Sequence, residues 1–144
     1  MSTIIGFTGT QKGCTEQQIQ WLESSLVHPS ITGFHHGDCI GADADAHHIA
    51  YISGLPITIH PPINRSKRAY CARSEAKNVI ILEPKEYITR NHDIVDACTC
   101  LFACPYEFYE QLRSGTWATI RYATRLGKRL WIIFPDGSVE KRNY

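Results

Sequence analysis

Apolar and polar positions alternate in blocks along the 144-residue chain, and the block lengths predict strands that alternate with helices. Short apolar runs rich in β-branched residues are typical of strands that are buried on both faces of a sheet. We expect such strands at residues 3–8, 31–36, 56–60, 98–103 and 130–134, with a shorter strand or buried tether at 79–82 and an edge strand or tail at 139–144.

The segments between these runs have apolar residues at helical spacing, which predicts helices. Apolar residues recur three or four positions apart after residue 15, and Thr15 with Gln18 forms a capping box that marks a helix start. Similar patterns predict helices at about 42–53 and 87–97, and another that opens near Gly115 and closes at Gly127.

The segment 63–78 carries no clear period. It is polar and basic, so it fits either a long connection over the mouth of the sheet or a solvated surface loop. Its polar and basic residues include Asn64, Arg65, Lys67, Arg68, Arg73 and Lys77.

Strands that alternate with helices predict an α/β fold, with a mainly parallel sheet flanked by helices. The length suits one domain with a single core over residues 1–144. We expect the strand at 3–8 to be central and the strand at 98–103 to lie beside it, across the point where the strand order reverses.

Charge and hydropathy narrow the possible partners. The chain has 15 Lys and Arg against 14 Asp and Glu, a net charge of +1, and no basic tail, so nucleic acid is not expected as the main partner. The longest apolar runs have strand length, which argues against a membrane span. The first residues enter a strand directly and lack a signal-peptide pattern, so we expect a cytoplasmic protein.

The cysteines and histidines do not suggest a metal or another cofactor. The six cysteines form no CxxC pair, and we interpret them as buried thiols rather than metal ligands or disulfides. His35 and His36 are adjacent on a strand, and His47 and His48 are adjacent on a helix, so neither pair presents two ligands to one ion. We therefore predict no metal site.

The segment from Arg113 to Thr116 supplies the strongest local evidence for a ligand site. It follows a strand and a loop and opens a helix, where the first backbone N–H groups have no partner within the helix. Gly115 would allow close approach of an anion, and Thr116 would offer a hydroxyl. The simpler interpretation is that Ser114 or Thr116 is an ordinary helix cap.

Three short motifs occur in an order that resembles the SLOG superfamily of Rossmann-like domains. They are the turn GFTGT at residues 6–10, the segment HGDCIGAD at 36–43, and the pair Arg90-Asn91 followed by SGT at 114–116. The superfamily includes DNA-processing-A-like proteins and the "lonely guy" phosphoribohydrolases. The similarity covers most of the chain and is closest to small bacterial and phage members.

The resemblance implies a site for a nucleotide or nucleotide-derived molecule at the carboxyl ends of the strands, where open α/β sheets bind ligands. Carried over to this chain, the ligand-binding residues would be Gly9, Thr10, Gly37, Asp38, Gly41, Asp43, Arg90, Asn91, Arg113, Ser114, Gly115 and Thr116. For Asp43, a charge at a helix start is the competing role.

One departure from the family pattern affects the expected chemistry. The phosphoribohydrolases carry a catalytic glutamate at the position of Thr119, and threonine cannot serve as a carboxylate acid or base. Asp38, Asp43, Glu107 and Glu110 remain possible carboxylates. We therefore favour a sensor or sequestering protein, with a hydrolase of an N-glycosidic or phosphate bond as the alternative and a DNA-binding module as a third hypothesis.

Aromatic residues gather around one loop and the helix after it. They are Tyr106, Phe108, Tyr109, Trp117 and Tyr122. Exposed aromatic side chains at this density are typical of an interface, which favours a homo-oligomer, although Trp117 and Tyr122 could simply pack on the sheet.

Overall fold

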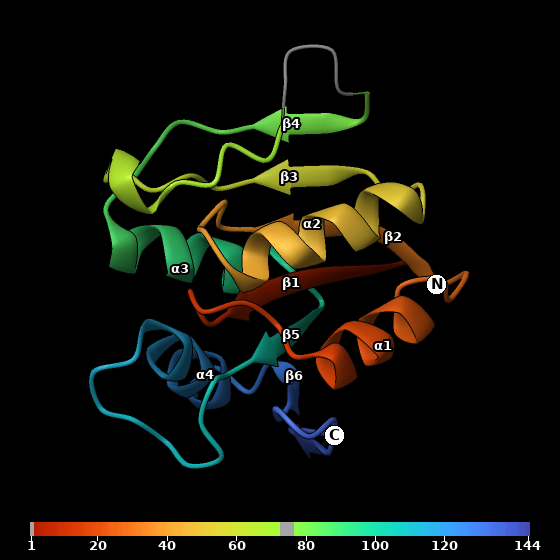
Figure 1. Cartoon of the computed structure of the whole chain (residues 1–144), viewed down its shortest axis with the longest axis vertical. Coiled ribbons are helices and arrows are strands. Elements are labelled where there is room, and N and C mark those ends of the chain that lie inside the picture. Colours follow the sequence, from red (N-terminus) through yellow and green to blue (C-terminus); the bar gives the residue numbers. More distant parts are fainter. Residues whose placement is uncertain (1, 73–76) are drawn as a thin grey trace.

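Seven strands form one sheet with helices on both faces in the computed structural model, which describes residues 2–72 and 77–144 (Figure 1). The strand order is β4-β3-β2-β1-β5-β6-β7, with β1 to β6 parallel and β7 antiparallel to β6. The strands are β1 Thr3–Gly9, β2 Ile31–His36, β3 Ile57–Ile59, β4 Val79–Ile81, β5 Cys100–Cys104, β6 Arg129–Ile133 and β7 Val139–Arg142. The predicted α/β fold is confirmed.

Strand β1 lies at the centre of the sheet, between β2 and β5. The chain builds the sheet outwards through β2, β3 and β4 and then returns to place β5 on the other side of β1. Gly9 is paired with Cys104, so the carboxyl ends of β1 and β5 lie side by side. The predicted central strand and its neighbour across the switch point are therefore confirmed.

Two helices cover each face of the sheet. The helices are α1 Glu16–Ser25, α2 Ala42–Ile52, α3 Tyr87–Ala97 and α4 Gly115–Arg125. Alternate residues of β5 serve the two cores: Phe102 and Cys104 face the core beside α1 and α2, whereas Leu101 and Ala103 face the core beside α3 and α4. None of the helices described combines the length and the apolar character needed to cross a membrane.

Local hydrogen bonds explain several boundaries. The Thr15–Gln18 capping box forms as predicted at the start of α1. Strand β5 starts two residues later than predicted because Cys98 ends α3, with its N–H donating to the Val95 carbonyl at 3.3 Å. Thr99 Oγ1 then accepts a hydrogen bond from the Ile4 N–H at 3.1 Å.

The connection predicted at 63–78 contains a short 3-10 helix, η1 Arg65–Lys67. It lies against the segment that follows β2, because the Ile40 N–H donates to Lys67 O and the Ala69 N–H donates to Asp38 O. Residues 73–76, which include Arg73, lie outside the described residues.

Candidate functional site

A cavity of about 260 Å³ lies where β1 and β5 end and α4 begins. Three stretches of chain meet there: the turn after β1, the loop after β5 and the first turn of α4. The cavity brings together six of the predicted ligand-binding residues, which are Gly9, Thr10, Arg113, Ser114, Gly115 and Thr116.

The start of α4 presents free backbone donors to this cavity. Ser114 is the N-cap, and its Oγ accepts a hydrogen bond from the Trp117 N–H at 3.2 Å. Among the described residues, no hydrogen bond uses the N–H groups of Gly115 or Thr116. These two donors, together with the helix dipole, favour an anion at this position.

The turn after β1 is fixed by its contacts with the neighbouring elements. The Thr10 N–H donates to Cys104 O at 3.1 Å, and the Ala42 N–H donates to Thr10 O at 2.9 Å. Gly41 has a φ of 94°, and a Cβ there would lie 2.4 Å from the backbone of Gln11. A side chain at Gly41 would therefore displace the turn that lines the cavity.

The other predicted residues form a buried network behind the cavity. Arg90 is only 2 % exposed; its Nη1 donates to Gly37 O at 2.5 Å and to His60 O at 3.0 Å, and its Nε donates to Asn91 Oδ1 at 2.8 Å. These protein groups engage the Arg90 guanidinium, whereas Arg113 is among the residues that line the cavity. A ligand contact of Arg90 or Asn91 stays a prediction.

The two predicted aspartates also have protein partners. Asp38, which has a positive φ of 55°, accepts hydrogen bonds from Arg68 Nε at 2.8 Å and from the Cys71 N–H at 2.9 Å. Asp43 accepts from the Cys39 N–H at 3.1 Å. Burial raises the pKa of Asp43 to about 6, although the Arg90 guanidinium opposes this shift. These contacts tie the segment after β2 in place.

Tyr87 links this buried network to the cavity. Its ring lies 4.7 Å from the Arg90 guanidinium, and the tyrosine also lines the cavity. Burial raises the pKa of the Tyr87 hydroxyl. A Cβ on Gly115 would lie 2.8 Å from Tyr87 Cε1, so the glycine is needed for packing against this ring. Arg90 therefore positions one wall of the cavity through Tyr87.

The cavity is also lined by four residues that the site prediction did not include: Gln11, Tyr87, Tyr106 and Glu107. Glu107 accepts a hydrogen bond from the indole nitrogen of Trp117 at 3.1 Å, which fixes its carboxylate. Lys12 places its ammonium group 3.9 Å from the centre of the Tyr106 ring. The sequence marked Glu107 as a carboxylate and Tyr106 as an aromatic residue, but no local pattern placed them at the cavity.

The histidines pair across elements. His36 Nε2 and His47 Nδ1 are 2.9 Å apart, and one ring nitrogen of each histidine lies within 4.8 Å of Cys71 Sγ. Such a cluster could hold an ion, but the Asp38 N–H donates to His36 Nδ1 at 2.9 Å. A neutral His36 therefore carries its proton on Nε2, which donates to His47 Nδ1, and an ion at Nε2 would have to displace this proton.

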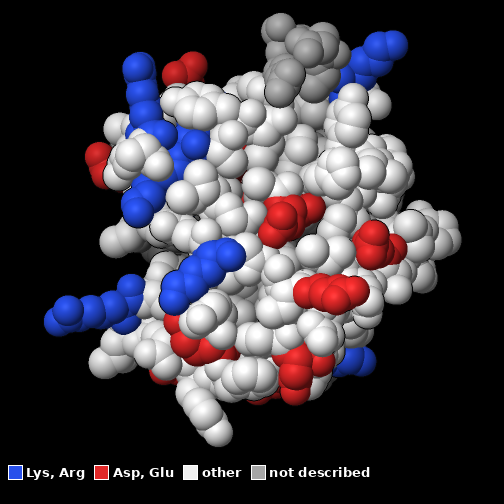
Figure 2. Space-filling view, viewed as in Figure 1, with Lys and Arg blue, Asp and Glu red and all other residues white. Residues whose placement is uncertain are grey.

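Several basic side chains lie at this edge of the sheet. In the view of Figure 2, which matches Figure 1, most of the visible Lys and Arg side chains lie toward the left edge. The arrows of β3 and β4 in Figure 1 point toward this edge, so these basic side chains, with several Asp and Glu among them, lie toward the carboxyl ends of the parallel strands.

Comparisons with known proteins find similar solved structures. No family model matches the chain, and no curated protein matches its sequence. A molybdenum cofactor binding protein from the phototrophic bacterium Rippkaea orientalis superimposes with a TM-score of 0.69 at 17 % identity, covering 93 % of this chain and 77 % of that one.

Two further structures are similar. The molybdenum cofactor carrier protein of Chlamydomonas reinhardtii has a TM-score of 0.61 at 16 % identity, covering 94 % of this chain and 77 % of that one. A structural genomics target, TM1055, has a TM-score of 0.62 at 14 % identity, covering 90 % and 72 % of the two chains. These likenesses confirm the Rossmann-like fold that the SLOG resemblance implied.

Proposed function

We propose that this protein binds a phosphate-bearing, nucleotide-derived small molecule in the cavity at the carboxyl ends of β1 and β5. The observation that carries this proposal is the pair of N–H groups on Gly115 and Thr116, which no hydrogen bond among the described residues uses, at a cavity that both residues and Arg113 line. A phosphate would accept from both N–H groups, and a guanidinium can pair with two of its oxygens.

The lining also suggests how the rest of the ligand would be recognised. The Glu107 carboxylate, held by the Trp117 indole, would accept hydrogen bonds from the amino or imino groups of a heterocycle. The rings of Tyr87 and Tyr106 provide apolar surface on the same cavity. Two similar structures are described as binding or carrying the molybdenum cofactor, which supports a binding role for a small molecule.

A sensor or sequestering role fits this cavity better than the phosphoribohydrolase mechanism. Thr119 stands where that mechanism needs a glutamate, and its hydroxyl donates to Gly115 O at 2.9 Å within the helix. A hydrolase remains the second candidate because Glu107 is a carboxylate that lines the cavity. Incubation with a nucleotide panel, followed by mass spectrometry, separates the two: a sensor returns the nucleotide intact, whereas a hydrolase releases products.

Substitution of Thr116 tests the site itself. We expect Thr116→Val to lower the affinity for the bound nucleotide about ten- to a hundredfold, because a lost hydrogen bond to a charged group costs roughly 1.5–3 kcal/mol. Thr124→Val is the matched control, since Thr124 lies on the same helix and donates to Ile120 O at 2.8 Å. If the folded Thr116→Val and Thr124→Val variants bind the nucleotide with equal affinity, Thr116 does not belong to the binding site.

We also propose that the protein forms a homo-oligomer. Tyr106, Phe108 and Tyr109 are 52 %, 49 % and 81 % exposed on the loop beside the cavity, whereas Trp117 is buried. We expect these exposed rings to form the interface of a homo-oligomer. Light scattering that gives a monomer mass at micromolar concentration would contradict it.

A further inference from the structure

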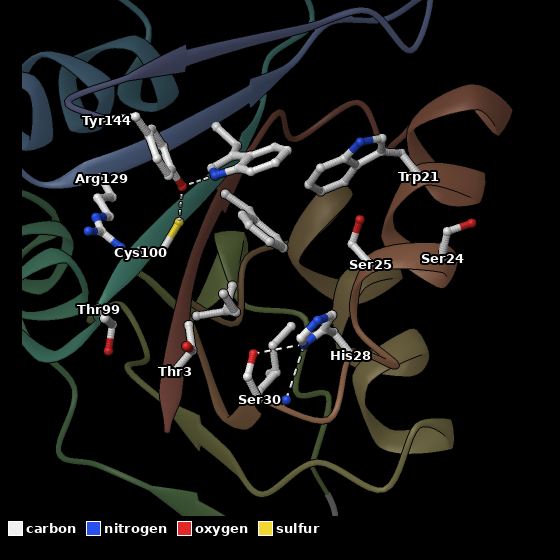
Figure 3. A pocket seen from close by; sticks show the side chains of 14 residues that line it. Thr3, Trp21, Ser24, Ser25, His28, Ser30, Thr99, Cys100, Arg129 and Tyr144 are labelled. Carbon is white, nitrogen blue, oxygen red and sulfur yellow. Dashed lines mark hydrogen bonds between the residues drawn. The ribbon is translucent and has the colours of Figure 1, made fainter. Parts of the chain in front are cut away.

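A groove of about 470 Å³ lies at the edge of the sheet opposite to the candidate site (Figure 3). Thr3, Cys100 and Arg129 line it at the starts of β1, β5 and β6, so it is formed by the amino ends of the strands. Helix α2 packs on β1, β2 and β3, and α1 packs on α2. On the face of the sheet that carries α1 and α2, Trp21 of α1 covers β5 and β6. The groove lies beside this tryptophan.

One wall of the groove is aromatic. The ring of Trp21 lies 4.9 Å from that of Phe102 and 5.6 Å from that of Trp131, measured between ring centres. Both indoles are partly exposed. Binding sites for small molecules are commonly lined by such rings with a few polar groups, and a groove of this size suits a ligand with two fused rings.

The polar lining favours an anion. Among the described residues that line the groove there is no Asp or Glu, while Arg129 contributes a guanidinium. The ion pairs formed by the described residues do not involve Arg129, whose guanidinium lies 5.6 Å from the centre of the Tyr144 ring. Hydroxyl groups of Ser24, Ser25 and Ser30 lie on the opposite side (Figure 3).

We propose that this groove binds an aromatic small molecule that carries one anionic group. The ring of the ligand lies against Trp21 and Trp131, and its anionic group pairs with Arg129. A planar ring gains contact with the exposed indole surface, and the unpaired guanidinium supplies charge in a groove that offers no competing carboxylate. This site is separate from the proposed nucleotide site, because the two lie at opposite ends of the strands.

The three tryptophans allow a test that reports on both sites at once. Trp21 and Trp131 line the groove, whereas the Trp117 indole donates to Glu107 at the nucleotide cavity. In a titration of ¹⁵N-labelled protein with 2-naphthoate, we expect the indole signals of Trp21 and Trp131 to shift saturably and that of Trp117 to stay in place. Signals that stay unchanged at millimolar naphthoate, or a shift of Trp117 alone, would overturn the proposal.

A matched pair of ligands and one variant test the role of charge. We expect 2-naphthamide, which has the same rings but no charge, to bind about tenfold more weakly than 2-naphthoate. Arg129→Gln should remove this preference by weakening naphthoate about tenfold while leaving naphthamide unchanged. Arg129 is exposed at the first position of β6, so the variant is expected to fold. Equal binding of both ligands to the parent protein would refute the pairing with Arg129.

Discussion

The two ends of the strands are built in different ways. At the carboxyl ends, residues with unused backbone donors line a polar cavity, and a buried network around Arg90 lies behind it. At the amino ends, large aromatic side chains from α1, β5 and β6 line a groove with one arginine. The first site depends on backbone geometry, and the second depends on side chains that lie far apart in the sequence.

This difference indicates what each end tolerates. The cavity at the carboxyl ends rests on close approaches, such as that of Gly41 to the backbone of Gln11, so substitutions there should disturb stability as well as binding. The amino-terminal groove is partly open to solvent, so substitutions of its polar residues should alter binding and leave the fold intact.

Replacement of Arg90 should cause the greatest loss of stability. Arg90→Gln leaves the carbonyls of Gly37 and His60 without their donor, and the Asp43 carboxylate without a nearby cation. Breaking a buried charged network of this kind costs roughly 3–5 kcal/mol. Urea unfolding measures it, with Arg129→Gln at the opposite edge as the control, for which we expect a change of less than about 0.5 kcal/mol. Similar losses in both variants would contradict the contrast.

Two glycines with positive φ separate backbone strain from crowding. Gly41 and Gly54 have φ values of 94° and 78°, but a Cβ at Gly54 meets no described atom within 4 Å. Gly54→Ala should cost about 1–2 kcal/mol, the strain of the left-handed conformation. Gly41→Ala should cost roughly 1–2 kcal/mol more and also weaken nucleotide binding, because it displaces the turn at Gln11. Thermal unfolding and nucleotide titration of both variants would show whether the crowding matters.

Histidines near the carboxyl ends of β2 and β3 should make the protein sensitive to acid. Burial lowers the pKa of His36 well below its ordinary value and lowers that of His60 to about 4. Because the unfolded chain takes up these protons near pH 6.5 and the folded chain does not, stability falls as the pH drops from 6.5 toward 4. We expect a loss on the order of 2 kcal/mol.

Asp43 opposes this trend, which gives the pH prediction a control. Its raised pKa of about 6 means that the folded state binds a proton more tightly than the unfolded state, so this group stabilises the fold as the pH falls. Asp43→Asn removes the opposing contribution and should steepen the loss in acid. Denaturation curves at pH 7, 5.5 and 4.5 measure the slope, and a flatter curve for the variant would show that the signs are wrong.

The smallest effect is expected at Lys12, whose ammonium group lies over the Tyr106 ring at the edge of the cavity. Lys12→Gln should weaken nucleotide binding a few-fold at low salt, because an exposed charge contributes up to about 1 kcal/mol. The difference should disappear at high ionic strength. Lys141→Gln on β7 is a control, since its ammonium group lies over Trp131. A loss that persists at high salt would indicate a direct contact with the ligand.

The sequence predicted most of the fold because the signals were local. The apolar run at 3–8 and the capping box at Thr15 act within a few residues, and each specifies one element. The switch point followed from the order of those elements. The predicted start of β5 was two residues too early, because Cys98 caps the C-terminus of α3. The apolar run alone does not indicate that its first residue belongs to the helix end.

The candidate site could be predicted only where its parts are backbone motifs. The glycine turn after β1 and the Ser114–Thr116 helix start carry their own sequence signals, and the structure brings them to one cavity. Tyr87 and Glu107 reach that cavity from a neighbouring helix and a loop without such a signal. Likewise, Trp21 and Trp131 are 110 positions apart in the printed sequence, so their shared groove depends on the tertiary packing of α1 on the sheet.

The central claim, that a nucleotide-derived ligand binds at the carboxyl ends of the strands, is tested most directly by the indole signals during a nucleotide titration. We predict that the Trp117 signal shifts saturably, because its N–H donates to Glu107 in the cavity lining. Trp21 and Trp131, at the opposite edge, should stay in place. Shifts confined to Trp21 and Trp131, or an unchanged Trp117 signal at millimolar concentrations of every nucleotide in the panel, would contradict the account.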